Sequence, residues 1–200
     1  MAISNLIFNN GTIANKLFSN VNFSVFLENY KNGIFSRIER MNYEEFSLEQ
    51  IINSSLLSHI TIQDTTKSLS VQMVPARFAP WNTNANTWDG SIPTTVVEVS
   101  ISFCGNQQLL QCRPSSLTIP APNGHIKDSK ICFYETLWNE EAEKNLKDKV
   151  NNNINLIHKF TVELNKQIDI ENVNLTNEIN ELYTKKYKIL NRQYELLKTI

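Results

Sequence analysis

Cysteines and histidines in the middle of the chain are the residue types best suited to nucleophilic chemistry. Cys104 and Cys112 precede His125, and a thiol beside an imidazole base can act as the nucleophile of an acyl-transfer enzyme. Such a site also needs a third group that orients the imidazole, and only closeness along the chain supports the pairing. We therefore favour the alternative that these cysteines are small, buried hydrophobic side chains.

Metal and phosphate chemistry are not predicted. His59, His125 and His158 lie far apart, with no acid or cysteine at ligand spacing. The three cysteines form no Cys-x-x-Cys pair. The chain has five glycines in 200 residues, which argues against glycine-rich loops that cradle phosphate. We therefore expect no cofactor and no metal site.

The segment "RPSS" at residues 113–116 places serines beside an arginine. Neither the Gly-x-Ser-x-Gly elbow nor the Ser-x-x-Lys motif of serine enzymes accompanies it. A structural role is expected for Arg113, which would pair with a carboxylate or hydrogen-bond to loop carbonyls. Because no nucleophile, base or phosphate loop stands at usable spacing, the sequence predicts no enzymatic activity.

Tryptophans and a run of cations are the candidate contact residues for a macromolecule. Trp81 and Trp88 lie in a long loop, 75–93, that is bounded by prolines. They could stack on bases or grip a partner, although we favour a role in covering one face of a small sheet. Near the C-terminus Lys185, Lys186, Lys188 and Arg192 form a basic strip. Together these residues support an alternative function, nucleic-acid binding.

Helices within residues 1–59 are the first of the elements that must position these residues. Phe26, Tyr30, Ile34 and Ile38 recur at intervals of four, which predicts a helix with Ser24 as its N-cap. A second helix is expected to start at Ser47, where "SLEQ" has the form of a capping box. The opening "LIFNNGTI" would suit a small hairpin, because Asn-Gly favours a tight turn.

Residues 60–135 change to an alternating pattern. Val97, Val99, Ile101 and Phe103 alternate with polar residues, as in a strand with one solvated face. A similar alternation runs through "SLSVQMV", and a hairpin around "HIKDSKICFYETL" would close the sheet. Between them, "CGNQQLLQC" predicts a short connection with one helical turn. A small antiparallel sheet is therefore expected here.

From about Asn139 the pattern returns to a helical period in two long stretches. The segment "DIENVN" at 169–174 separates them, and Asp169 and Asn174 suit a cap or turn. We therefore predict a C-terminal αα-hairpin. The expected fold is α+β, with an α+β domain at 1–138 and a long helical hairpin at 139–200.

The last helix carries a wide apolar stripe that a small sheet would not cover. An uncovered stripe of this width normally marks a contact site for another protein. Tyr187, Tyr194 and Leu197 are the expected anchors. The sequence therefore predicts self-association or binding of an effector protein.

Composition indicates an ordinary globular chain. The formal net charge is −1, so no overall field draws the chain to nucleic acid or anionic lipid. No apolar run is long enough to span a membrane, and no signal peptide is expected at the N-terminus. An odd number of cysteines suggests reduced thiols, and the abundance of Asn and Lys indicates a bacterial protein. We expect a cytoplasmic location.

Several segments taken together resemble a module of bacterial multidomain proteins that are suspected of anti-phage defence. The resemblance covers roughly residues 23–195 and rests on "FCG", "RPS", "PNG" and "DIENVN". Its positions are Phe103, Gly105, Arg113 to Ser115, Pro122, Gly124, Asp169, Glu171, Val173 and Asn174. The resemblance implies a non-catalytic part that precedes a TIR or nuclease effector domain. Since the chain ends at Ile200 without one, it implies an effector on a separate polypeptide, or a module that acts alone as sensor or adaptor.

Overall fold

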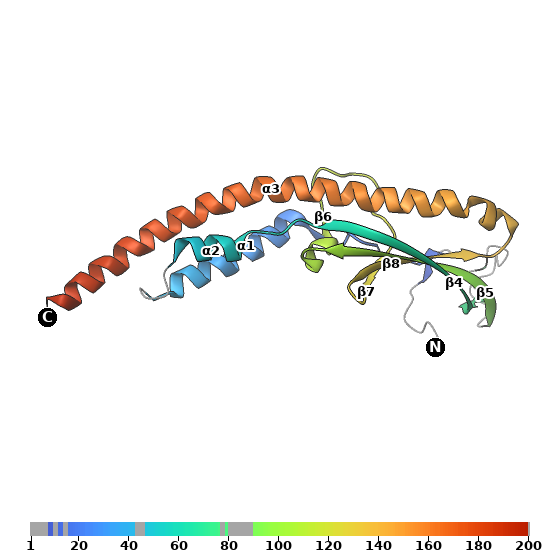
Figure 1. Ribbon diagram of the computed structural model, residues 1–200, viewed down its shortest axis with the longest axis horizontal. Helices are drawn as coiled ribbons and strands as arrows, with labels where there is room; N and C mark the ends of the chain where they lie inside the picture. The colour runs from blue at the N-terminus through green and yellow to red at the C-terminus, as the bar shows by residue number, and fades with distance from the viewer. Residues whose placement is uncertain are drawn as a thin grey trace.

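The computed structural model describes residues 8–9, 12–13, 16–42, 47–76, 79 and 90–199. One very long helix, α3 (Glu140–Lys198), extends along the molecule. A twisted sheet packs under its first half, and the helices α1 (Phe23–Arg40) and α2 (Leu48–Ser55) pack further along it (Figure 1). The predicted mixed α+β class is confirmed.

The main sheet has four antiparallel strands in the order β4-β5-β8-β7. Its strands are β4 (Thr61–Pro75), β5 (Ser91–Cys104), β8 (Lys130–Leu137) and β7 (His125–Lys127). Thus β4, one of the two longest strands, lies at an edge of the sheet. The antiparallel sheet and its closing hairpin, β7–β8, are as the alternating pattern predicted.

Short elements complete the fold. The pair β1 (Phe8–Asn9) and β2 (Thr12–Ile13) is antiparallel, as expected for the opening hairpin. The pair β3 (Val21–Asn22) and β6 (Cys112–Arg113) is parallel. The predicted helical turn in "CGNQQLLQC" is the 3₁₀ helix η3 (Gln107–Gln111), whose first turn is capped by the side chain of Asn106.

Gly105 is required by a close approach of two backbone segments just before this turn. Its φ is +113°, a region that side chains with a Cβ rarely adopt. A Cβ added there would lie 2.3 Å from the backbone oxygen of His59. Gly105, the glycine of the segment "FCG", therefore allows the chain to pack closely against the backbone at the start of β4.

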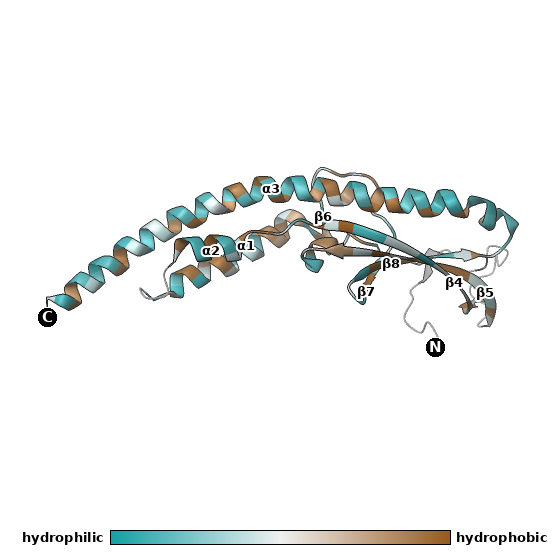
Figure 2. Cartoon of the chain, viewed as in Figure 1, coloured by the Kyte–Doolittle hydropathy of each residue, from teal (hydrophilic) through white to brown (hydrophobic). Residues whose placement is uncertain are grey.

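The alternating side chains of β5 place apolar residues on the face under α3, and these residues form a core between the sheet and the helix. Val99 and Ile101 are fully buried and pair with Phe133 and Ile131 of β8 on the same face. They pack with residues of α3 such as Ile157, Phe160 and Leu164. Figure 2 shows hydrophobic and hydrophilic residues alternating along α3.

The helices α1 and α2 form a second cluster with a later part of α3. Ile38 and Ile51 pack there with Leu175 and Ile179 of α3. As expected, α2 begins directly after Ser47, although the Ser47 side chain makes no capping hydrogen bond. The prediction of Ser24 as N-cap was wrong, because α1 starts at Phe23 with Asn22 in the N-cap position.

The predicted C-terminal hairpin was also wrong, because α3 continues through 169–174 without a break. Ile168 and Leu175 are both fully buried and lie seven positions apart, so the buried stripe stays in phase across the segment. The segment holds no glycine or proline to end the helix. Asp169 and Asn174 are therefore interior helical residues rather than turn residues.

Three asparagine side chains of α3 each bind both backbone polar groups of one residue elsewhere. Asn153 accepts from the N–H of Asn123 and donates to its carbonyl, both at 2.8 Å. Asn165 makes the same two bonds to Ile60, at 2.9 and 2.8 Å. Asn172 does so to Leu57, at 2.9 and 3.0 Å. We call these three contacts the asparagine clamps.

The spacing of two clamps matches the chain that they hold. Asn165 and Asn172 are two helical turns apart, about 10.5 Å along the axis. Leu57 and Ile60 are joined by an extended segment that spans about 10 Å. The connection between α2 and β4 can therefore run antiparallel to α3 with both residues in register. The two clamps therefore hold α1 and α2 on one side of this connection, and the sheet on the other, at fixed positions along α3.

The continuity of α3 gives a direct test at Val173, whose side chain is 63% exposed. Val173→Pro should lower the free energy of unfolding by about 3 kcal/mol or more, because proline removes a helical hydrogen bond and clashes with the preceding turn. Val173→Ala, the matched control, should be nearly neutral. Chemical denaturation followed by circular dichroism measures both. A proline variant as stable as the alanine control would mean that a turn, not a helix, occupies 169–174.

Loss of a clamp should destabilise the protein more than loss of an exposed asparagine. Asn165→Ala leaves the N–H and carbonyl of Ile60 without their partner and should cost about 2 kcal/mol. Asn151→Ala, on the exposed side of the same helix, should be neutral or slightly stabilising, since alanine is the better helix former. Equal denaturation midpoints for the two variants would contradict a structural role for the clamp.

Candidate functional site

The C-terminal end of α3 extends past the elements that cover the rest of the helix. Lys186 Nζ donates to the backbone oxygen of Glu39, near the end of α1, at 2.8 Å. Beyond this bond α3 continues for about three turns, past α1 and α2 (Figure 1). We call residues 184–198 the α3 tail.

A seam of apolar side chains runs from the covered part of α3 along the tail. Its members are separated by steps of four, three, four and three residues, the spacing of a coiled-coil contact line: they are Tyr183, Tyr187, Leu190, Tyr194 and Leu197. We call these five residues the tail seam. Tyr183 contributes to the cluster with α1 and α2, whereas Tyr187, Tyr194 and Leu197 are 41%, 43% and 71% exposed.

The rings of the seam are ordered along the helix. Tyr183 and Tyr187 stack with ring centroids 6.0 Å apart. The ammonium group of Lys198 lies 4.4 Å from the centroid of the Tyr194 ring. Ile189 and Leu196, about 100° around the helix from Leu190 and Leu197, are 54% and 56% exposed and continue the stripe of Leu175 and Leu182 at seven-residue intervals. The buried face of α3 therefore continues as an exposed apolar face.

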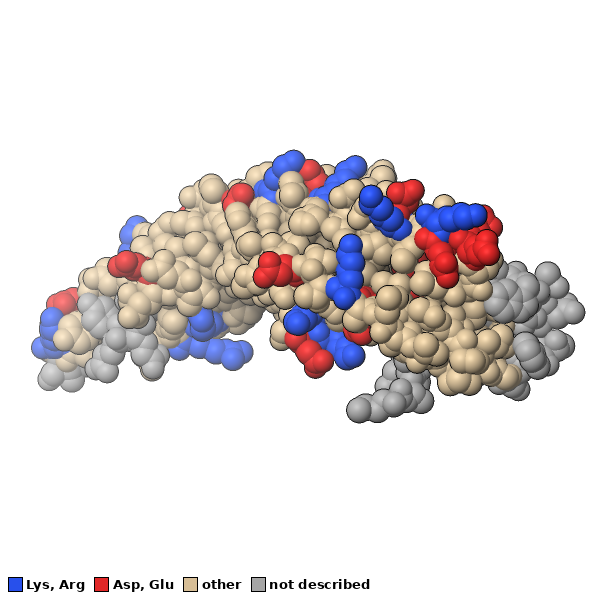
Figure 3. Space-filling model, turned by 45° about the vertical axis from the view of Figure 1, so that its right-hand side comes forward, with Lys and Arg blue, Asp and Glu red and all other residues tan. Residues whose placement is uncertain are grey.

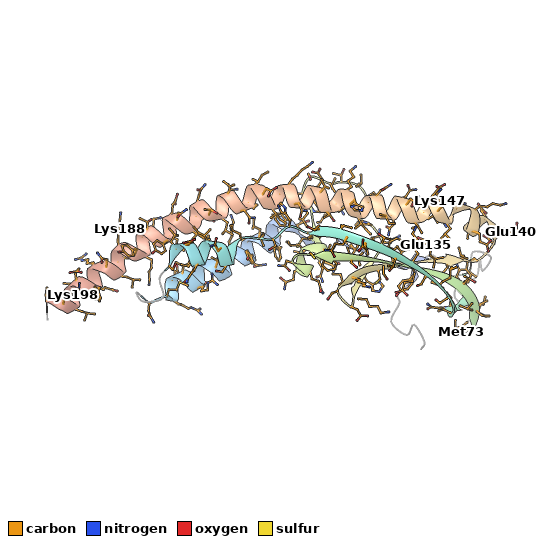
Figure 4. All side chains as sticks on the ribbon, viewed as in Figure 1. Met73, Glu135, Glu140, Lys147, Lys188 and Lys198 are labelled. Atoms are coloured by element: carbon orange, nitrogen blue, oxygen red, sulfur yellow. The ribbon has the colours of Figure 1, made fainter. Side chains whose placement is uncertain are left out.

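The tail also carries an excess of cations. Within the tail Glu195 is the one acidic residue, against the cations Lys185, Lys186, Lys188, Arg192 and Lys198. Figure 4 shows Lys188 and Lys198 on the projecting part of α3. Elsewhere acidic and basic side chains are interspersed, as on the face in Figure 3. The tail thus combines an apolar seam with a local positive charge.

The predicted contact residues fall into two groups. Tyr187, Tyr194 and Leu197 lie together on the tail seam, and the basic strip Lys185–Arg192 lies on the same helical segment. Trp81 and Trp88 lie outside the described residues, as does most of the predicted 75–93 loop.

Arg113 is a half-buried residue that binds loop carbonyls, one of the two arrangements expected for it. Its Nη2 donates to the carbonyls of Leu117 and Ile119, at 3.1 and 2.9 Å, and its Nε donates to Leu117 at 3.3 Å. The guanidinium therefore organises the segment between β6 and β7.

The structure places Cys104, Cys112 and His125 in different surroundings. Cys112 is buried, and burial raises the pKa of its thiol to about 11. Cys104 is exposed and accepts a hydrogen bond from Gln63 at 3.0 Å. His125 stacks on Tyr134, and burial lowers its pKa. Within the described ranges, no group of three His, Cys, Asp or Glu residues could hold a metal ion.

One contact, between His59 and Asp169, was not predicted from any sequence pattern. Their side chains approach to 2.6 Å from the start of β4 and the middle of α3. Since 110 residues separate them in the sequence, only the packing of α3 brings them together. Both side chains are largely exposed, and the pair lies beside the asparagine clamps at Asn165 and Asn172.

A recess of about 420 Å³ lies where α1, α3 and Ser115 meet. Four of its polar lining residues are paired: Lys31 binds Glu178 at 2.7 Å and Glu171 at 3.5 Å, and Gln167 donates to Ser115 at 2.8 Å. These contacts hold α1 and the "RPSS" loop against α3.

No protein family, curated protein or solved structure matches this chain. Among the described residues, none of the helices has the length and apolar character that crossing a bilayer requires. The physical features of the tail are therefore the basis for a functional proposal.

Glu135 is a partly buried carboxylate on the sheet face under α3, opposite Val97 (Figure 4). Burial raises its pKa, and the opposing charge of Lys149 offsets this in part. A raised pKa means that the folded state binds the proton more tightly than the unfolded state does. The cost of burying the charged form is therefore absent below the ordinary carboxyl pKa of 4.5 and develops as the pH rises through the raised pKa.

Glu135→Gln should consequently stabilise the protein at neutral and alkaline pH and have little effect under acidic conditions. We expect a rise in Tm of about 2 to 4 °C at pH 8, the shift that roughly 1 kcal/mol produces in a chain of this size. Glu181→Gln, at an exposed position of α3, is the control and should leave the pH dependence unchanged. A Glu135→Gln variant that is less stable than the wild type at pH 8 would overturn the sign of this effect.

Proposed function

We propose that this protein is a non-enzymatic interaction subunit whose α3 tail docks an acidic amphipathic helix of another protein. The observation that carries the proposal is the tail seam, which continues the buried face of α3 beyond its own covering helices. In the covered part, α1 and α2 pack on this face. In the tail, side chains of the same kind are exposed.

The spacing of the seam favours a helix as the occupant. Steps of four and three residues bring side chains to one line on a helix, which a second helix can pack against with interlocking side chains. Tyrosines are well suited to such a contact, because each buries a large ring while its hydroxyl stays in water. An exposed apolar face of this kind is typical of a protein contact site.

Charge favours a partner other than a second tail. Five cations and one acid lie within residues 184–198. Two tails packed side by side would bring two segments of net positive charge together, and like charges weaken binding and suppress wrong partners. An acidic helix would instead be attracted to the tail and positioned by its charges.

The resemblance to defence proteins suggests a setting for this contact. A non-catalytic module that precedes an effector would act as adaptor or sensor, and the helix that it docks would belong to a TIR or nuclease effector supplied by another polypeptide. This setting is bacterial and cytoplasmic. Nucleic acid is the other polyanion that the basic strip could attract, and the experiment below distinguishes it.

Site-specific photocrosslinking in the producing cell tests the proposal. A photoreactive amino acid replaces Tyr194 in the full-length chain, and in a control it replaces Val173, which is similarly exposed but lies outside the tail. The crosslinked peptide is then identified by mass spectrometry. We expect crosslinks from position 194 only, to a segment of another protein with apolar residues at heptad spacing and excess Asp and Glu.

A second variant ties the contact to the seam. Tyr187→Ala combined with Leu197→Ala should abolish the crosslink from position 194, because anchor residues typically contribute about 2 kcal/mol or more each. Ile170→Ala combined with Val173→Ala should preserve it. A crosslink to nucleic acid, to a second copy of the tail, or to a basic segment would overturn the proposal, as would equal crosslinking from both positions.

A further inference from the structure

The edge strand β4 is a second exposed surface, at the opposite end of the molecule from the tail. Within the described part of the chain β4 pairs with β5 alone, so its other edge carries backbone donors and acceptors without a strand partner. Every residue from 63 to 71 is exposed. Because the side chains of a strand point alternately to its two faces, both faces and the edge are open here.

Three apolar side chains lie together on one face of this strand. Leu69, Val71 and Met73 are 69%, 72% and 59% exposed. They pair in register with Val97, Thr95 and Pro93 of β5. By this alternation they share the face on which Val99 packs under α3. Figures 1 and 4 show the β4–β5 ribbon curving away from α3 toward the end where Met73 is labelled.

The opposite face of the same segment is polar. Ser68, Ser70 and Gln72 alternate with the apolar side chains, and Gln72 donates to the Ser70 hydroxyl at 2.8 Å. A regular apolar and polar alternation is the pattern of a strand with one face buried. In β4 the apolar face has no such cover among the described residues.

The strand has few of the features that normally protect an edge. Bulges, prolines and inward-pointing charges prevent strand addition in many proteins. In β4 the one irregularity falls between Ile62 and Thr65, and pairing is continuous from Thr65 to Pro75. Between these residues Lys67 is the single charged side chain. The edge therefore offers an uninterrupted run long enough to pair with another strand.

We propose that β4 pairs antiparallel with β4 of a second copy of this chain, joining two four-stranded sheets into one. A two-fold axis perpendicular to the sheet keeps each side chain on its own face. With this axis near Val71, the apolar triplet of one copy packs against the same triplet of the other. The shared ladder also supplies partners for the free backbone groups.

Two features favour a second copy as the occupant of this edge: the apolar triplet matches itself about the two-fold axis, and the charge of the strand does not oppose pairing. Residues 61–75 hold one acid, Asp64, and one cation, Lys67, so two copies of the strand do not repel each other. Two copies of the tail would repel each other, because the tail has an excess of cations. Pairing through β4 leaves both tails exposed at opposite ends of the dimer, and each could dock a helix independently.

The expected affinity is modest. A stable interface buries about 800 Å² on each partner, and one strand edge with three apolar side chains provides less than a typical set of interface residues. We therefore expect a monomer–dimer equilibrium in the micromolar range rather than a permanent dimer. This inference is independent of the proposed function of the tail.

Sedimentation over a range of concentrations tests it with the full-length protein. The wild-type mass should rise from that of a monomer to that of a dimer as concentration increases. Leu69→Lys combined with Met73→Lys should hold the protein as a monomer, because the two copies would then place four cations at the contact. Tyr187→Lys, on the tail, should leave the equilibrium unchanged. A wild-type protein that stays monomeric throughout overturns the proposal.

Disulfide trapping tests the register, and it does not depend on the lysine variants folding correctly. In a Cys104→Ser background, Val71→Cys should form a covalent dimer on mild oxidation, because the two copies of residue 71 lie near the axis. Thr65→Cys, on the same face but far from the axis, should remain monomeric. Equal trapping at both positions, or dimerisation that the Tyr187→Lys variant abolishes, would show that β4 is not the contact.

Discussion

The asparagine clamps are the contacts on which the arrangement of this molecule depends. An apolar stripe on a helix does not specify where along the helix axis another element packs. A shift of that element by one helical turn keeps similar side chains in contact. Each clamp instead binds both polar groups of one backbone residue, which a shifted register would leave unpaired at a cost of about 1–3 kcal/mol. Asn165 and Asn172 therefore fix the connection between α2 and β4 to a defined part of α3.

This constraint explains why α1 and α2 end before the tail does and why β4 lies at the edge of the described sheet. With the clamps in place, α1 and α2 reach α3 only as far as Tyr183 and Lys186, so the tail extends past them. At the other end, α3 lies over β5 and β8 while the edge strand β4 stays open. The two exposed apolar surfaces are thus consequences of where one long helix is held. Their separation would allow the chain to contact one partner at each end.

Local patterns predicted the element types well because each depends on near neighbours in the chain. The alternation from Val97 to Phe103 identified β5, and the steps along α3 identified a helix. The segment 169–174 was interpreted as a turn because Asp and Asn are common at helix ends. Packing outweighed this preference, since Ile168 and Leu175 lie on the same buried face of α3 only if the helix continues between them. The apolar residues of the candidate site and their expected exposure were equally visible in the sequence, but the point along α3 at which α1 and α2 end was not.

The amino-acid sequence by itself determined the α+β class, the alternating strands, the helical period and the apolar spacing of the tail seam. These follow from the geometry of a single helix or strand, which repeats over a few residues. Only the tertiary structure decided that α3 is one helix, that Asn165 binds Ile60, and that His59 meets Asp169. Such contacts join residues more than a hundred positions apart, and their partners are set by the packing of the whole chain rather than by any local pattern.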